Sequence, residues 1–181
     1  MQDTIEKLLK NFIPTLKGAQ RAALSKFRED AEAIFEEVLG RSAKLYKKLQ
    51  ALRELLICQW TEYLKDRFAE GFMCGILTGL ETFGGAGALD GKGFLPLKQN
   101  VLNLHGKYYQ STEQKQAAEK SERFIKALTK EFKQEAEVIR RVCDCWENIS
   151  FTEEAAYWNK GLRTGMGIGV NLALYLDKFE N

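Results

Sequence analysis

The chain has 181 residues, a formal net charge of +2, two prolines, one histidine and four cysteines. This length suits one sizeable core or two small ones, and the near balance of charge disfavours a general nucleic-acid binder, which carries a strong basic excess. Few prolines among many Ala, Leu, Lys and Glu residues predict an all-α protein. Four cysteines are few for a disulfide scaffold, so we expect a reduced, cytoplasmic protein.

The sequence predicts neither a signal peptide nor a membrane span. The N-terminal residues are polar and of mixed charge, unlike a secretory leader. The longest apolar stretch, residues 71–80, is too short to cross a bilayer, and Arg67, Glu70 and Glu81 flank it closely.

The first half of the chain carries three helix patterns. Apolar residues at helical spacing predict helices over residues 3–13 and 19–39, and Gly40 is a natural stop for the second. Ser42 then begins a long predicted helix that continues to residue 83.

Two segments ninety residues apart each carry a comb of glycines at spacings of four. The combs are Gly71, Gly75 and Gly79 in the first half and Gly161, Gly165 and Gly169 in the second. Residues four apart share one helix face, and each glycine costs about 1 kcal/mol of helix stability relative to alanine. Close helix packing at the combs is the expected compensation, either between the two comb helices or in a separate hairpin for each.

A glycine-rich run over residues 84–93 predicts a break between two helical units. The predicted division is a first helical unit over residues 1–83, a linker and tether over 84–106, and a second helical unit over 107–181 packed on the first. Phe94 and Leu95 follow the glycine run, and we interpret them as a plug for the core or as an anchor for a partner.

The second half repeats the helix-forming pattern of the first. Ser111 with Gln114 is typical of a helix start, and the helix is predicted to run through Val142. Ser150 with Glu153 forms another capping box, which predicts a separate last helix that carries the second comb. The expected fold is a helical bundle of two pseudo-repeated halves, each ending in a Gly-x-x-x-Gly-x-x-x-Gly helix.

No catalytic, cofactor or metal motif stands out. The run Gly91-Lys92-Gly93 lacks both the first glycine and the hydroxyl of a phosphate-binding loop. The single histidine, His105, excludes zinc motifs that need a histidine pair. Cys143 and Cys145 would point about 160° apart around a helix axis. We therefore expect no enzyme, no cofactor and no metal.

A basic stripe marks the start of the long first-half helix, formed by Arg41, Lys44, Lys47 and Lys48, and residues 140–141 form a smaller one. Such a stripe is typical of a solvated helix face. The alternative is contact with nucleic acid or with an acidic protein surface.

The run Phe68-Ala69-Glu70-Gly71-Phe72-x-x-Gly75, followed by Glu81, resembles the signature of a family of small helical bacterial and phage proteins of unknown function. The resemblance covers residues 19–83, and the second half resembles a diverged copy, with Leu162 and Asn171 in place of a phenylalanine and the glutamate. It implies a phage or mobile-element context, in which small helical proteins act by stoichiometric binding, as anti-CRISPR inhibitors do.

The expected function is therefore that of a non-enzymatic binding protein in the cytoplasm of a bacterial host. It would block a nucleoprotein nuclease, such as a Cas effector, by direct protein contact at the basic stripe or the apolar tether. One alternative is a small nucleic-acid-binding regulator. Another is a self-assembling structural protein in which the glycine combs form a homodimer interface.

Overall fold

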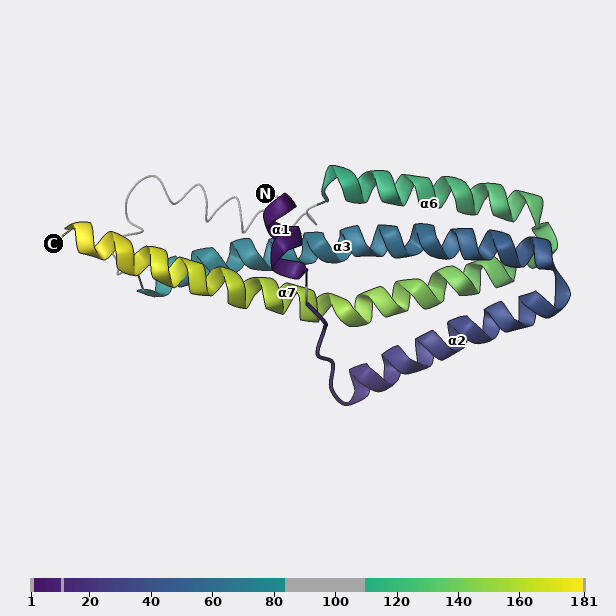
Figure 1. The fold of residues 1–181 in the computed structure, drawn as a ribbon, viewed down its shortest axis with the longest axis horizontal. Helices are drawn as coiled ribbons and strands as arrows, with labels where there is room; N and C mark the ends of the chain where they lie inside the picture. The colour runs from purple at the N-terminus through teal and green to yellow at the C-terminus, as the bar shows by residue number, and fades with distance from the viewer. Residues whose placement is uncertain (1, 11, 84–109, 181) are drawn as a thin grey trace. The chain divides into compact units, whose positions relative to one another are not determined.

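The computed structural model describes residues 2–10, 12–83 and 110–180, and every element in this part of the chain is helical (Figure 1). The elements are α1 (Gln2–Leu9), α2 (Ala19–Arg41), α3 (Ala43–Phe83), α6 (Thr112–Glu131), the short 3-10 helix η1 (Lys133–Glu135) and α7 (Ala136–Glu180). The all-α prediction is confirmed.

The helices form two compact units, and each unit takes segments from both halves of the sequence. Unit 1 comprises residues 1–13, 65–110 and 155–181, and unit 2 comprises residues 14–64 and 111–154. The long helices α3 and α7 each contribute one part to each unit.

Two predicted helix boundaries in the second half are wrong. The helix expected through Val142 ends at Glu131, because Phe132 leaves the helical region with φ −117° and ψ 59°. Conversely, Ser150 begins no helix but lies buried inside the 45-residue α7. A capping sequence starts a helix only where the preceding chain is not already helical, and the burial of Ile149 and Ser150 in the packed unit holds this segment of α7 helical.

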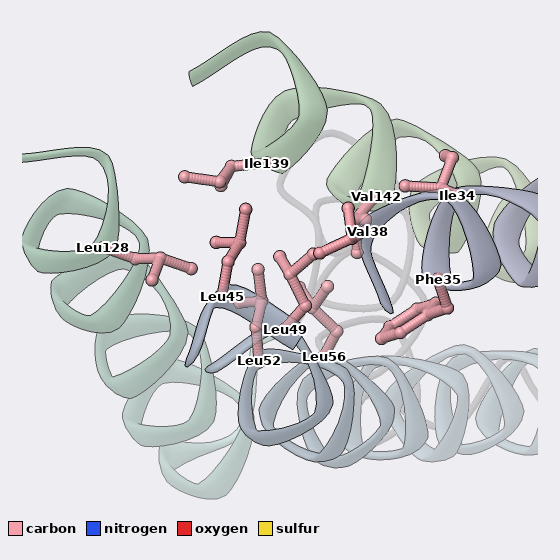
Figure 2. Packing of buried hydrophobic residues seen from close by; sticks show 10 residues of the cluster. All are labelled: Ile34, Phe35, Val38, Leu45, Leu49, Leu52, Leu56, Leu128, Ile139 and Val142. Carbon is pink, nitrogen blue, oxygen red and sulfur yellow. The ribbon is translucent and has the colours of Figure 1, made fainter. Parts of the chain in front are cut away.

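Unit 2 packs α2, α6 and the first parts of α3 and α7 around one apolar core (Figure 2). The core residues are Ile34, Phe35, Val38, Leu45, Leu49, Leu52, Leu56, Leu128, Ile139 and Val142. The four leucines recur along α3 at spacings of three and four, and none is more than 3% exposed. The helical period predicted from the sequence thus forms the inner face of α3 in this unit.

In unit 1 the glycine combs bring α3 and α7 into close contact. A Cβ atom added at any of the six comb glycines would lie closer than 3.0 Å to the backbone of the other helix. Gly71 faces the backbone of Trp158, and Gly79, farther along α3, faces that of Met166, so the two helices run in the same direction. Of the two packing arrangements that the sequence left open, the comb helices adopt the one in which they pack on each other.

Helix α1 and the residues after it lie against the same helix pair in unit 1. The Glu6 carboxylate is 3.0 Å from the Lys65 ammonium. The Phe12 ring meets Tyr157 edge to face at 5.0 Å, and the Lys160 ammonium lies 5.9 Å from the Phe12 ring centre. The N-terminal segment is therefore fixed to both α3 and α7.

Candidate functional site

The predicted basic stripe lies at the end of unit 2 where α2 passes into α3. The Ser42 hydroxyl positions the start of α3 by accepting a hydrogen bond from the backbone N–H of Leu45 at 3.2 Å. The side chains of Lys44, Lys47 and Lys48 follow on the first two turns of α3. Their spacings of three and four place the three ammonium groups on one helix face, where all are accessible to solvent.

Glutamates neutralise part of this stripe. Arg41, the last residue of α2, pairs with Glu37. The Glu131 carboxylate, at the end of α6, lies 2.5 Å from the Lys44 ammonium and 4.0 Å from that of Lys48. The hydrogen bond from Lys44 lowers the pKa of Glu131, so this carboxyl group stays ionised at neutral pH.

The connection from α6 to α7 brings further cations to the same end. Lys130 and Lys133 border an open hollow of about 390 Å³, which is lined by Ser42, Leu45 and residues 130–135. Among the described residues, no ion pair forms at Lys130, at Lys133 or at Lys47 of the stripe.

Phe132 shapes this hollow because it interrupts the helical path. Its backbone N–H closes α6 by donating to the Leu128 carbonyl at 2.9 Å, and the chain then turns through η1 before α7 begins. Its ring lies 5.3 Å from the Lys44 ammonium, a cation–π contact that joins the two helix connections.

We call residues 37–48 and 127–141 the hairpin end of unit 2. It contains eight Lys or Arg residues and four Glu residues, a net charge of +4, whereas the whole chain carries only +2. Arg140 pairs with Glu137 at 3.0 Å and with Asp144 at 2.9 Å, and Arg141 lies 3.8 Å from Glu37. The positive charge of the chain is therefore concentrated at this end.

Three of the four cysteines, Cys74, Cys143 and Cys145, have raised thiol pKa values. Burial, reinforced by Asp144 and Glu147, raises the pKa of the Cys143 thiol to about 11, so it is almost wholly protonated at neutral pH. Burial also raises the pKa values of Cys74 and Cys145. No group of three or more His, Cys, Asp or Glu side chains within residues 2–10, 12–83 and 110–180 could hold a metal ion.

None of the described helices is both long enough and apolar enough to cross a bilayer.

The structure brings together the four stripe residues but does not describe the predicted tether. Phe94 and Leu95 lie outside the described residues, as does His105. Sequence reasoning missed Lys130 and Lys133 as part of the basic surface. The ninety-residue offset between the glycine combs was the available signal. Applied to positions 40–45, where the stripe begins, it points to positions 130–135, which include both lysines.

No protein-family model matches this chain, and no curated protein or solved structure matches it at a significant level. The resemblance to small helical phage proteins therefore stays a prediction.

Proposed function

We propose that the protein is a non-enzymatic binding protein whose hairpin end contacts an acidic surface of a partner protein. The observation that carries this proposal is the concentration of eight cations at the hairpin end, two of which, Lys130 and Lys133, line the hollow. Lys47, Lys130 and Lys133 make no ion pair within the described chain, so their charges are available to a partner.

The carboxylates at the same end favour a protein partner over nucleic acid. Glu131 and Glu135 line the hollow together with Lys130 and Lys133. A phosphate backbone presents only negative charge and would be repelled by these carboxylates, whereas an acidic protein surface carries both signs and can pair with each. A small nucleic-acid-binding regulator is the second candidate, favoured by the unpaired lysines alone.

The resemblance of residues 68–81 to small phage proteins supports a biological setting for this proposal. In that setting the protein acts in the cytoplasm of a bacterial host, and its partner is a nucleoprotein nuclease. Stoichiometric contact at the hairpin end would block the nuclease, as an anti-CRISPR inhibitor blocks a Cas effector.

We also propose that the chain is an internal duplication with an offset of ninety residues. The comb contacts that support it are reciprocal: Gly71 faces the backbone of Trp158, and Gly161 faces that of Phe68. Both pairs of contacting positions are related by the same offset. Because each comb is occupied by the other within one chain, we do not propose a homodimer through the combs.

The test is affinity capture from host lysate with the wild-type protein and a charge-reversal variant, each with and without nuclease treatment. The variant is Lys44→Glu, Lys47→Glu and Lys48→Glu. We expect a nuclease-resistant protein partner that the variant no longer captures, because reversing three charges opposes an acidic surface. A purified Cas effector captured in this way should then lose target cleavage when the wild-type protein is added.

The matched control reverses three exposed lysines elsewhere in unit 2, Lys26, Lys115 and Lys120, and should capture the partner as the wild type does. A partner that disappears after nuclease treatment would instead support the nucleic-acid regulator. Equal capture by the stripe variant and the wild type would remove the hairpin end from the proposal.

A further inference from the structure

Three aromatic side chains gather in unit 2, away from the hairpin end. Trp60 and Tyr63 lie one turn apart on α3 and meet edge to face with ring centres 5.5 Å apart. Phe151 on α7 lies 6.0 Å from the Trp60 ring and 6.3 Å from the Tyr63 ring. We call these three residues the aromatic cluster. Along α3, Trp60 is about 18 Å from Lys48, so the cluster is separate from the basic surface.

The cluster is open to solvent at Phe151, which is 50% exposed. Large aromatic side chains that stay exposed are enriched at sites of protein contact, where a partner covers them.

The surface around Phe151 is acidic. Glu147 and Glu154 lie one helical turn before and after it on α7, and neither forms an ion pair within the described residues. Glu153 is paired with Arg28 at 3.3 Å. An exposed aromatic ring between two unpaired carboxylates therefore presents an apolar centre with a negative rim.

We propose that the aromatic cluster binds a cationic, amphipathic helical segment of a partner protein. The apolar side chains of that segment cover Phe151, and its Arg or Lys side chains pair with Glu147 and Glu154 and contact the faces of the aromatic rings. Charge complementarity selects this occupant, because an acidic or nucleic-acid partner would be repelled by the same rim. The surface is independent of the hairpin end, so either proposal can fail without the other.

The test uses the full chain and a fluorescently labelled helical peptide composed of arginine and leucine, with binding followed by fluorescence anisotropy. A leucine–glutamate peptide of the same pattern serves as the charge control and should not bind. We expect Phe151→Ser to weaken binding of the arginine–leucine peptide about tenfold, which is typical for removal of an interface aromatic. Leu174→Ser, at a position 51% exposed in unit 1, is the matched control and should leave binding unchanged.

The double variant Glu147→Gln and Glu154→Gln tests the rim without touching the aromatic cluster. This variant should bind the arginine–leucine peptide more weakly, and its binding should depend less on salt concentration. If Phe151→Ser does not fold, the double variant alone tests the proposal. Binding that Phe151→Ser leaves unchanged, equal binding of both peptides, or no binding of the arginine–leucine peptide would overturn the proposal. Self-association in sedimentation that Phe151→Ser abolishes would also overturn it, since a second copy would then be the occupant.

Discussion

Alanine substitution at two glycines of α7, two residues apart, should change stability in opposite directions. A Cβ atom at Gly165 would lie 2.8 Å from the carbonyl carbon of Phe72 and 2.9 Å from the amide nitrogen of Ile76, and closer still to the Phe72 carbonyl oxygen. These are backbone atoms, so no side chain can rotate away. At Gly167 nothing lies within 4 Å of the added Cβ atom.

The magnitudes follow from the separation that Gly165→Ala imposes. Ordinary contact begins at 3.4 Å, so α3 and α7 must move apart by at least 0.6 Å to clear the Phe72 carbonyl carbon, and by more to clear its oxygen. Such a gap forfeits about a quarter or more of each dispersion contact, and overpacking of this kind costs about 1–3 kcal/mol. The helix propensity of alanine returns about 1 kcal/mol. Because the carbonyl oxygen is the closest atom, we expect a net loss of about 2 kcal/mol for Gly165→Ala. Gly167→Ala should gain about 1 kcal/mol.

Urea unfolding followed by far-UV circular dichroism measures both variants against the wild type. The difference of about 3 kcal/mol between them is large compared with the error of extrapolation for such curves. The close approach of the combs would be refuted if Gly165→Ala were as stable as Gly167→Ala. An unchanged m-value in both variants would show that the surface exposed on unfolding is the same, so the difference in the free energy of unfolding arises in the folded state.

Two further predictions concern titratable groups. With a pKa raised to about 11 from 9.0, Cys143 carries roughly a hundredfold less thiolate than an ordinary cysteine. Iodoacetamide should therefore modify the exposed Cys58 first and Cys143 last, as mass spectrometry of the peptide fragments can show. Early modification of Cys143 would contradict its burial. Burial raises the pKa of Glu153 above its ordinary value of 4.5, although Arg28 opposes the shift. The folded state therefore holds this proton more tightly, and stability is lost as the pH rises from the ordinary pKa through the raised one. The free energy of unfolding of Glu153→Gln, measured in urea, should equal that of the wild type below about pH 4. At about pH 7 it should match or exceed that of the wild type, because the exposed ion pair with Arg28 contributes little stability. A variant that is less stable only at the higher pH would contradict this sign.

The sequence predicted those features of the fold that depend on helical period. The leucines of α3 were recognisable from spacings of three and four, and the comb glycines marked a helix face because each must be compensated. The break at Phe132 was not predictable, because its helix-forming neighbours hide a turn that tertiary contacts impose. At Phe132 the fold overrides local helix propensity, and at Ser150 it overrides a local capping sequence.

The candidate surfaces could be predicted only in part, because they too depend on contacts between segments that are far apart in the sequence. The stripe from Arg41 to Lys48 is contiguous in sequence and could be read directly, but Lys130 and Lys133 join it only because the two helix connections meet at one end of unit 2. Phe151 was assigned to a helix start, where an exposed aromatic has no special meaning. Its contact with Trp60 requires α3 and α7 to be adjacent, which no local pattern states.

Comparing the residues at positions ninety apart separates the side chains that the fold requires from those that it tolerates. Under the proposed duplication, Arg41 and Lys47 correspond to Glu131 and Glu137. The same structural position thus accepts either sign of charge, and the basic stripe is not a condition for forming the helix. The charges instead make one connection complementary to the other, as the pairing of Lys44 with Glu131 shows.

The same comparison bears on the aromatic cluster. Under the proposed duplication, Phe151 corresponds to Thr61, which is exposed on α3, so the duplicated fold accepts a small polar side chain at this level. Trp60, which corresponds to the buried Ser150 under the same duplication, meets the Phe151 ring of α7 at 6.0 Å. Trp60 is therefore explained by packing against α7, whereas the exposed half of Phe151 is not, because the fold forms without an aromatic at the equivalent site. Under both proposals, an exposed ring that the fold does not need, between carboxylates that form no ion pair within the described residues, is explained by a partner that uses both.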